Sequence, residues 1–314
     1  MGERQAEQGE KSGVLRVGTR GSLLARTQTG MVVDQIRAAN PGLQVVVEII
    51  QTTGDMRRDV PFAAVGTKGM FVKEIEQALL DGAIDVGVHS LKDMPGELPA
   101  GLELACVPAR ESPYDALLTR GPKSIDELPQ GAVIGTSSVR RQAQLRYLRP
   151  DLRLEELRGN LDTRLRKLDE GQYDAIVLAA AGLNRLGWGD RVTVLLSRDI
   201  CVPAAGQGAL ALETRVADAA TLDRLAPLND RDSADSVAAE RAFLAALGGG
   251  CSVPAGAHAV LDGDRISLVA MIAAPDGSQL LRAEQTDDRV NASDLGKRVA
   301  ESLLKDGGRA ILQR

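Results

Sequence analysis

The sequence predicts an α/β protein in which two sheet-and-helix units are followed by a small α+β unit. Short β-branched runs alternate with longer amphipathic stretches, as they do where helices flank mainly parallel sheets. Residues 201–208, rich in Pro, Ala and Gly, indicate a return linker, and the character of the chain changes again after Asn229. With 314 residues the chain is also too long for one ordinary core.

The first unit follows a polar tail at residues 1–13, which we expect to be disordered. Residues 15–18 predict a strand and residues 23–38 a helix, with Ser22 as the N-cap because its hydroxyl can accept from a first-turn N–H group. The remaining elements of this unit are expected as strands at residues 45–51, 84–89 and 102–107 and a helix at residues 72–80.

The second unit begins after a boundary at residues 108–113, and its chain later returns to the first unit. Its expected elements are strands at residues 132–135 and 174–179 and helices at residues 139–148 and 161–168. Residues 209–213 then resemble a strand added back to the first sheet. Two crossings make a hinge, and ligands often bind between units joined in this way.

The third unit combines two helices with a hairpin. The helices are expected at residues 233–247 and 292–305, and the strands at residues 257–261 and 265–273. We therefore place domain 1 at residues 14–108 with 209–228, domain 2 at 109–208 and domain 3 at 229–314.

Composition excludes several classes of function. A net charge of -5 and an aromatic content of 2% argue against nucleic-acid or anionic-membrane partners. The longest apolar run, residues 175–183, is less than half a membrane span, and the N-terminus has no apolar signal core. We therefore expect a cytoplasmic protein. Three widely spaced cysteines and two histidines supply no metal site or disulfide framework.

Positive charge gathers between residues 136 and 167, where nine Arg or Lys residues face four Asp or Glu residues, a local charge of +5. A solvated helix face with ion pairs would also explain this cluster. Arg140 and Arg141, however, follow a strand-to-helix turn, where backbone N–H groups already favour an anion. Arg20 and Arg158 stand at similar turns. Together they suggest one multi-point site for a small polycarboxylate, which arginine binds with two parallel hydrogen bonds.

Three further segments carry candidate chemistry. Lys92 and Asp93 directly follow a strand, at the edge where open α/β sheets place active sites, although a surface turn is the simpler interpretation. Cys251 lies between glycines and a proline, so its sulfur is accessible as a covalent anchor or is an incidental loop thiol. Cys106 and Cys201 are expected in the core. Residues 66–69 could cradle phosphate or form a lid.

Taken together, these segments closely resemble the porphobilinogen deaminase (hydroxymethylbilane synthase) family. The matching runs occur in the family's order and cover the chain from about residue 14 onward. They are VGTRGS (17–22), HSLKDMP (89–95), GTSSVRRQ (135–142), RGNLDTR (158–164), AAAGLNR (179–185), PAAGQG (203–208) and GGCSVP (249–254).

The resemblance implies two domains similar to type II periplasmic binding proteins and a third domain bearing the cysteine. It implies a transferase of haem and porphyrin biosynthesis that deaminates four porphobilinogen molecules and joins them head to tail into hydroxymethylbilane. One dipyrromethane cofactor per chain would serve as primer, linked by a thioether to Cys251. The implied partners are porphobilinogen and the growing tetrapyrrole, and the chain is expected to be a monomer.

The matching positions also imply roles for single residues. Asp93 matches the catalytic carboxylate and Cys251 the cofactor attachment site. The other implied cofactor-binding residues are Ser90, Lys92, Thr136, Ser138, Arg140, Arg141, Arg164 and Arg185. The implied substrate-binding residues are Arg20, Gln28, Arg158, Asn160 and Gln207, and a mobile loop would contain Lys68 and Phe71.

Two departures and two alternative functions remain at this point. Leu23 and Tyr114 stand where many family members have other residues, and Tyr114 leaves the hinge in doubt. A two-lobed anion-binding protein would explain the first two units but not the third with its cysteine. An enzyme that uses nucleotide at residues 66–69 would lack the usual P-loop spacing and an acidic metal cluster.

Overall fold

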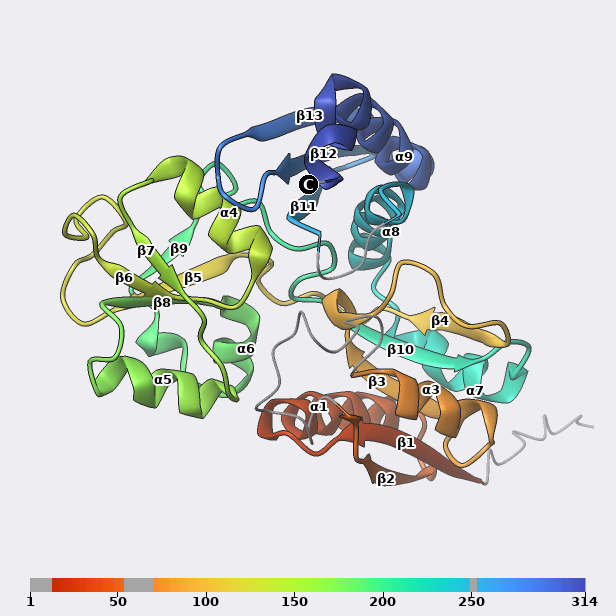
Figure 1. Ribbon diagram of the computed structural model, residues 1–314. Helices are drawn as coiled ribbons and strands as arrows, with labels where there is room; N and C mark the ends of the chain where they lie inside the picture. The colour runs from red at the N-terminus through yellow and green to blue at the C-terminus, as the bar shows by residue number, and fades with distance from the viewer. Residues whose placement is uncertain (1–12, 54–70, 249–252, 314) are drawn as a thin grey trace, which may run out of the picture.

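The computed structural model describes residues 13–53, 71–248 and 253–313, and these residues form three sheets with helices packed on them (Figure 1). Two sheets have five strands each and the C-terminal sheet has three. In the described part of the chain, no helix is both long and apolar enough to pass through a membrane.

The first sheet has the strand order β2-β1-β3-β10-β4. Its strands are β1 (Val14–Arg20), β2 (Gln44–Ile50), β3 (Val86–Ser90), β4 (Leu102–Cys106) and β10 (Leu210–Arg215), and its helices include α1 (Leu23–Ala39) and α3 (Lys73–Leu80). Helix α1 begins at the predicted N-cap, where the Ser22 hydroxyl accepts from Ala25 N at 3.3 Å. The return strand predicted after the linker is confirmed as β10.

The second sheet repeats this design with the order β7-β6-β8-β5-β9. Its strands are β5 (Asp115–Thr119), β6 (Val133–Gly135), β7 (Arg153–Glu155), β8 (Ala175–Ala179) and β9 (Val194–Leu196). Its helices include α4 (Val139–Leu148), α5 (Leu161–Asp169) and α6 (Ala180–Arg185). Helix α4 has the predicted bounds, whereas β5, β7 and β9 were not expected from the sequence.

Four of the five strands in each large sheet run in the same direction, which confirms the expectation of mainly parallel sheets, and the fifth strand runs against them. In each sheet the strand that receives the chain from the other unit runs antiparallel to its neighbours. Strand β10 starts opposite the end of β3, with Leu210 beside Ser90, and β5 starts opposite the end of β8, with Asp115 beside Ala179. A chain that enters at the edge where the parallel strands end has to run against them.

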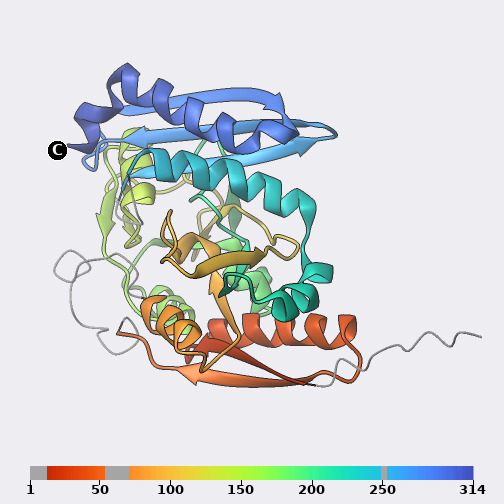
Figure 2. The same ribbon diagram turned by 90° about the vertical axis from the view of Figure 1, so that its right-hand side faces the viewer.

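The C-terminal unit packs two helices on one face of an antiparallel sheet. It contains α8 (Arg231–Ala246), β11 (Ala255–Asp262), β12 (Arg265–Ala273), β13 (Leu280–Asp288) and α9 (Ala292–Leu303), which includes the expected hairpin. Phe243 and Leu295 from the helices share a core with Leu268 of β12. The opposite face of β12 packs through Val269 against Ala143 of α4. Helix α8 lies between this sheet and the first unit (Figure 2).

All three units meet at Glu240 of α8, whose side chain is fully buried. Arg110 lies on the first crossing segment, the residues 107–114 between β4 and β5, and donates to both carboxylate oxygens at 2.8 and 3.0 Å. Two backbone N–H groups also donate to the Glu240 carboxylate. One is that of Gly206, at 2.7 Å, on the second crossing segment (residues 197–209, between β9 and β10), and the other is that of Ala259 in β11, at 2.8 Å. Burial alone would raise the pKa of Glu240, but the charge and hydrogen bonds of Arg110, together with the adjacent His258, outweigh burial and lower it to about 2.

Replacing Glu240 by Gln leaves the buried Arg110 guanidinium without a counter-charge. We expect the free energy of unfolding to fall by about 3–5 kcal/mol, measured by urea denaturation. The matched control is Glu170→Gln, which breaks the half-exposed pair with Arg166 and is expected to cost less than about 1 kcal/mol.

The loss of stability in Glu240→Gln should depend on pH. The folded-state pKa of Glu240 lies below its ordinary value of 4.5. Its contribution to the free energy of unfolding is therefore complete above pH 4.5 and is lost as the pH falls toward about 2. The stability difference between the unsubstituted chain and Glu240→Gln should therefore shrink across that window. A constant difference from pH 6 to pH 3 would contradict this account.

Candidate active site

The site forms where strands of the first two units end at their shared boundary. Strand β3 runs directly into a short 3-10 helix, η2 (Leu91–Asp93), which presents Lys92 and Asp93. On the facing unit, β6 leads into α4, which carries Arg140 and Arg141. The carboxyl ends of strands in open α/β sheets are the usual place for ligand binding.

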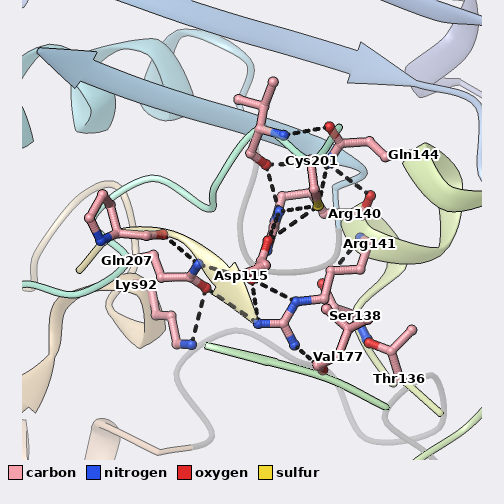
Figure 3. A network of polar contacts seen from close by, with 12 residues as sticks. Lys92, Asp115, Thr136, Ser138, Arg140, Arg141, Gln144, Val177, Cys201 and Gln207 are labelled. Atoms are coloured by element: carbon pink, nitrogen blue, oxygen red, sulfur yellow. Dashed lines mark hydrogen bonds and ion pairs between the residues drawn. The ribbon is translucent and has the colours of Figure 1, made fainter. Parts of the chain in front are cut away.

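A buried carboxylate that sequence reasoning missed organises this boundary (Figure 3). Asp115, the first residue of β5, is fully buried. Arg140 donates to its two oxygens at 2.7 and 3.1 Å, and Arg141 Nε donates to Oδ1 at 2.8 Å. Burial would raise the pKa of Asp115, but the two arginine charges lower it far below its ordinary range. Arg140 donates also to Val202 O at 2.5 Å, so much of its donor capacity serves the protein itself.

Gln207 joins this carboxylate to the first unit. Its side chain is buried, and its amide nitrogen donates to Asp115 Oδ1 at 2.9 Å and to Pro113 O at 2.7 Å. Its amide oxygen accepts from Lys92 Nζ at 3.4 Å and from Arg141 Nη2 at 3.5 Å. We call Lys92, Asp115, Arg140, Arg141 and Gln207 the charged cluster.

Positive charge exceeds negative charge around the charged cluster. Burial lowers the pKa of Lys92 to about 8; the charges of Arg141 and Arg140 also lower it, and Asp93 and Asp115 partly compensate. Burial and the charge of Arg141 likewise lower the pKa of nearby Arg164 to about 10. The site therefore contains four cations and two carboxylates, which gives these described groups a net charge of +2. The cations are Lys92, Arg140, Arg141 and Arg164, and the carboxylates are Asp93 and Asp115. Such a site favours an anion.

Arg164 is the cation in this group with the fewest partners. Its Nε donates to Gly159 O at 2.8 Å, and it forms no ion pair with any described carboxylate. Arg166, two residues along the same helix, instead pairs with Glu170 at 2.7 Å on the exposed face. Helix periodicity separates the two side chains onto different faces. Arg164 and Arg166 therefore lie on different faces of α5, with Arg166 on the exposed face.

Thr136 and Ser138 shape the start of helix α4. The Ser138 hydroxyl caps the helix by accepting from Arg141 N at 3.5 Å, and Thr136 Oγ1 accepts from Ser138 N at 3.3 Å. These contacts fix the first turn, which carries Arg140 and Arg141. Each hydroxyl hydrogen can still be donated to an anion.

A second group of expected residues lies around α1. Gln28 is buried and accepts from the Ser90 hydroxyl at 3.2 Å, which ties α1 to the end of β3. The Arg20 guanidinium lies over the Phe71 ring, 4.0 Å from its centroid. Arg185 Nη2 donates to the carbonyl of Gly208 at 2.7 Å.

Two expected substrate-binding residues are not joined to the charged cluster by any hydrogen bond or ion pair in the described residues. Arg158 donates to both oxygens of Glu156 at 2.7 and 2.8 Å. Asn160 is the N-cap residue of α5, although its side chain makes no capping bond. Both therefore lie at the start of α5 rather than beside Asp115.

The second crossing segment needs glycine at two positions. Gly206 and Gly208 have φ angles of 72° and 88°, which side chains rarely adopt. A Cβ atom at Gly206 would lie 2.0 Å from Leu91 Cδ2, and one at Gly208 would lie 2.3 Å from Glu111 O. The crossing therefore passes close to η2 and to the other crossing, with Gln207 held between the two glycines.

The segment that carries Cys251 lies outside the described residues, as does Lys68. Described residues on either side of the Cys251 segment contact the surroundings of the site. In the second half of α8, Arg241 Nη2 donates to Gly96 O at 3.0 Å, three residues beyond Asp93 in the sequence. At the start of β11, Ala257 N donates to Pro203 O at 2.9 Å on the second crossing.

The other two cysteines belong to the interior, as expected. Burial raises the pKa of both Cys106 and Cys201 to about 12, so neither is a thiolate near neutral pH. The Cys201 thiol donates to Asp115 at 3.2 Å and packs under the charged cluster.

Two family models match the chain and together span most of it. The first, described as "Porphobilinogen deaminase, dipyromethane cofactor binding domain", matches residues 15–223. The second, described as "Porphobilinogen deaminase, C-terminal domain", matches residues 234–305.

Relatives of known name agree. A porphobilinogen deaminase of Syntrophobacter fumaroxidans is 50% identical over 300 residues, covering 96% of this chain and 97% of its own. One from Syntrophotalea carbinolica is 52% identical and covers 96% of each chain. One from Roseiflexus castenholzii is 52% identical and covers 95% of this chain and 98% of its own.

Solved structures with a similar course of the backbone include two methionine-binding proteins. A nutrient-binding protein from Burkholderia cenocepacia bound to methionine has a TM-score of 0.42 and 15% identity, covering 68% of this chain and 90% of that chain. The methionine-binding protein MetQ has a TM-score of 0.44 and 15% identity, covering 71% and 94%. By its two family models and its relatives, the chain belongs to the porphobilinogen deaminase family.

Proposed function

We propose that the cations of the charged cluster and Arg164 hold the carboxylates of linked pyrroles while Asp93 acts on the reacting pyrrole. The reaction of the family joins four porphobilinogen molecules head to tail into hydroxymethylbilane. Each pyrrole carries an acetate and a propionate, so the product gains negative charge as it grows. The excess of two positive charges around Lys92, Arg141 and Arg164 is the observation that supports this assignment.

The described residues fit a dipyrromethane cofactor by the chemistry of their donors. When bound, this group supplies the pyrrole end to which the first substrate is joined. Lys92, Arg141 and Arg164 offer cationic donors for its carboxylates, and the hydroxyls of Thr136 and Ser138 offer neutral ones. The desolvation of Lys92 and Arg164 makes an added carboxylate favourable, because its negative charge offsets the solvation that each cation loses on burial.

Asp93 is proposed as the catalytic residue because of its position among these cations. It lies at the end of η2, and its negative charge acts on both Lys92 and Arg164. When ammonia leaves porphobilinogen, positive charge develops on the pyrrole, and a fixed carboxylate stabilises that charge. The same carboxylate can accept a pyrrole proton and return it.

Cys251 is proposed as the attachment site for the cofactor. Described residues on either side of its segment support this proposal, because Arg241 contacts Gly96, close to η2, and Ala257 contacts Pro203 on the second crossing. For the remaining matched residues we propose the roles that the family resemblance implies. Ser90 and Arg185 would bind the cofactor, and Phe71 would belong to a mobile loop. The proposed substrate-binding residues are Arg20, Gln28, Arg158 and Asn160.

We also propose the domain bounds given above and a cytoplasmic monomer without nucleic-acid partners. The three sheets lie within residues 14–106 with 210–215, 115–196 and 255–288, which supports those bounds. The net charge of -5 supports the absence of bulk attraction to nucleic acid.

Intact-mass measurement tests the covalent anchor. The purified chain should carry a mass excess equal to two linked pyrroles, and Cys251→Ala should lack it because no thiolate can form the thioether. Cys106→Ala is the matched control and should keep the excess, since Cys106 is buried in the first sheet. An unmodified chain that stays inert with porphobilinogen would refute the proposed function.

Asp93→Asn tests the catalytic carboxylate. The variant keeps the shape of the side chain but loses its charge and its ability to accept a proton. We expect full cofactor loading by intact mass, with a fall in kcat of about 10²–10⁴-fold in a single-substrate assay of pyrrole consumption. A kcat within threefold of the unsubstituted enzyme would remove Asp93 from this role.

Arg164→Gln and Arg166→Gln form a matched pair on one helix. Arg164→Gln should lower kcat/KM by about 10–100-fold, because a charge-assisted bond to a substrate or cofactor carboxylate is lost. Arg166→Gln removes only an exposed ion pair and should change kcat/KM by less than about twofold. Equal effects of the two substitutions would show that Arg164 makes no ligand contact.

A further inference from the structure

Asp115 and Gln207 occupy a place in the charged cluster that neither the family models nor the relatives' names explain. Both side chains are almost fully buried, with 0% and 1% of their surface exposed. The Asp115 carboxylate lies among Arg140, Arg141, Cys201 and Gln207, and these contacts account for both oxygens. Neither residue is placed to meet a ligand directly.

Gln207 connects two parts of the chain that belong to different sheets. Its nitrogen holds Asp115, at the start of the second sheet, and the Pro113 carbonyl on the first crossing. Its oxygen faces Lys92, which follows the first sheet, and also Arg141 (Figure 3). One neutral amide oxygen thus lies between two cations that would otherwise repel each other across the boundary.

We propose that Asp115 and Gln207 are positioning residues that build one carboxylate clamp from the cations of two domains. Asp115 holds the guanidinium of Arg141 in place. Gln207 contacts both Asp115 and Lys92, so it fixes the position of Lys92 relative to Arg141 across the domain boundary. The ligand of this clamp is a pyrrole carboxylate, so the inference rests on the proposed function. It replaces the direct substrate contact expected for Gln207 with an indirect role.

The geometry explains why an aspartate and a glutamine serve here. The Asp115 carboxylate compensates one of the two arginines that contact it, so the pair keeps a net positive charge for a ligand. The primary amide of Gln207 donates at one end and accepts at the other, which allows contact with a carboxylate and with two cations at once. A carboxylate at position 207 would repel Asp115, and an apolar side chain would break the link to Lys92.

The test uses the full-length, cofactor-loaded chain with three substitutions. Asp115→Asn removes the charge but keeps the shape, and Gln207→Leu removes the polar link at similar volume. Asp85→Asn is the matched control, because Asp85 is also a carboxylate held by two arginines, Arg16 and Arg215, in the first sheet. Thermal unfolding, intact mass and kcat/KM are measured for each variant and for the Asp115→Asn/Gln207→Leu double variant.

Both aspartate variants should unfold at lower temperature, but only Asp115→Asn should lose kcat/KM, by about 100-fold, because the clamp is misplaced. Gln207→Leu should lose about tenfold. The double variant should be no worse than Asp115→Asn alone, since Gln207 acts through the same clamp. Equal kcat/KM values for the Asp115→Asn and Asp85→Asn variants, or losses that multiply in the double variant, would overturn the proposal.

A second readout needs no substrate. NMR titration of the Lys92 ammonium, assigned with Lys92→Arg, reports the charge around it, and its pKa is about 8 in the unsubstituted chain. Asp115→Asn should lower this pKa further, because Arg140 and Arg141 lose their counter-charge, whereas Asp85→Asn should leave it unchanged. An unchanged Lys92 pKa in Asp115→Asn would refute the link. If the unsubstituted chain did not consume porphobilinogen, the proposed function would fail while this titration still decided the positioning role.

Discussion

The ion pair between Arg110 and Glu240 is the contact on which the arrangement of the three units depends. It joins the first crossing segment to helix α8, and backbone N–H groups of the second crossing and of β11 complete the shell of the carboxylate. Buried charges are stable only when they are paired and fully hydrogen-bonded. Because both crossings and the C-terminal unit share one carboxylate, this contact fixes helix α8 and strand β11 relative to the two crossing segments.

The charged cluster differs from the Arg110–Glu240 pair because its charges are not balanced within the protein. Glu240 is satisfied entirely within the protein, whereas Lys92, Arg141 and Arg164 share a site whose positive charges outnumber its carboxylates. That imbalance costs stability in the absence of a ligand, and an anionic ligand relieves it. The fold thus concentrates positive charge at the boundary between the two large sheets, which is where we propose that the carboxylates of the ligand bind.

Local signals predicted much of this structure, and long-range partnerships were the part that they missed. The Ser22 cap, the bounds of α4 and the return strand β10 follow from capping chemistry, periodicity and linker composition. The single antiparallel strand in each large sheet was not foreseen, since its direction depends on where the chain re-enters the sheet. Asp115 carried no local signal, because its partners Arg140, Arg141 and Gln207 lie 25 to 92 residues away. Cys251 and Lys68 lie outside the described residues.

The placement of β10 has a consequence for the order in which the chain acquires its structure during synthesis. Strand β4 pairs only with β10 within the described sheet, so the first sheet stays open until residues 210–215 have left the ribosome. By then the whole second sheet has already been made. The N-terminal unit is therefore completed after the middle one, against the usual N-to-C order of domain folding. Until then, β3 exposes an unpaired edge that a chaperone or a neighbouring nascent chain can reach.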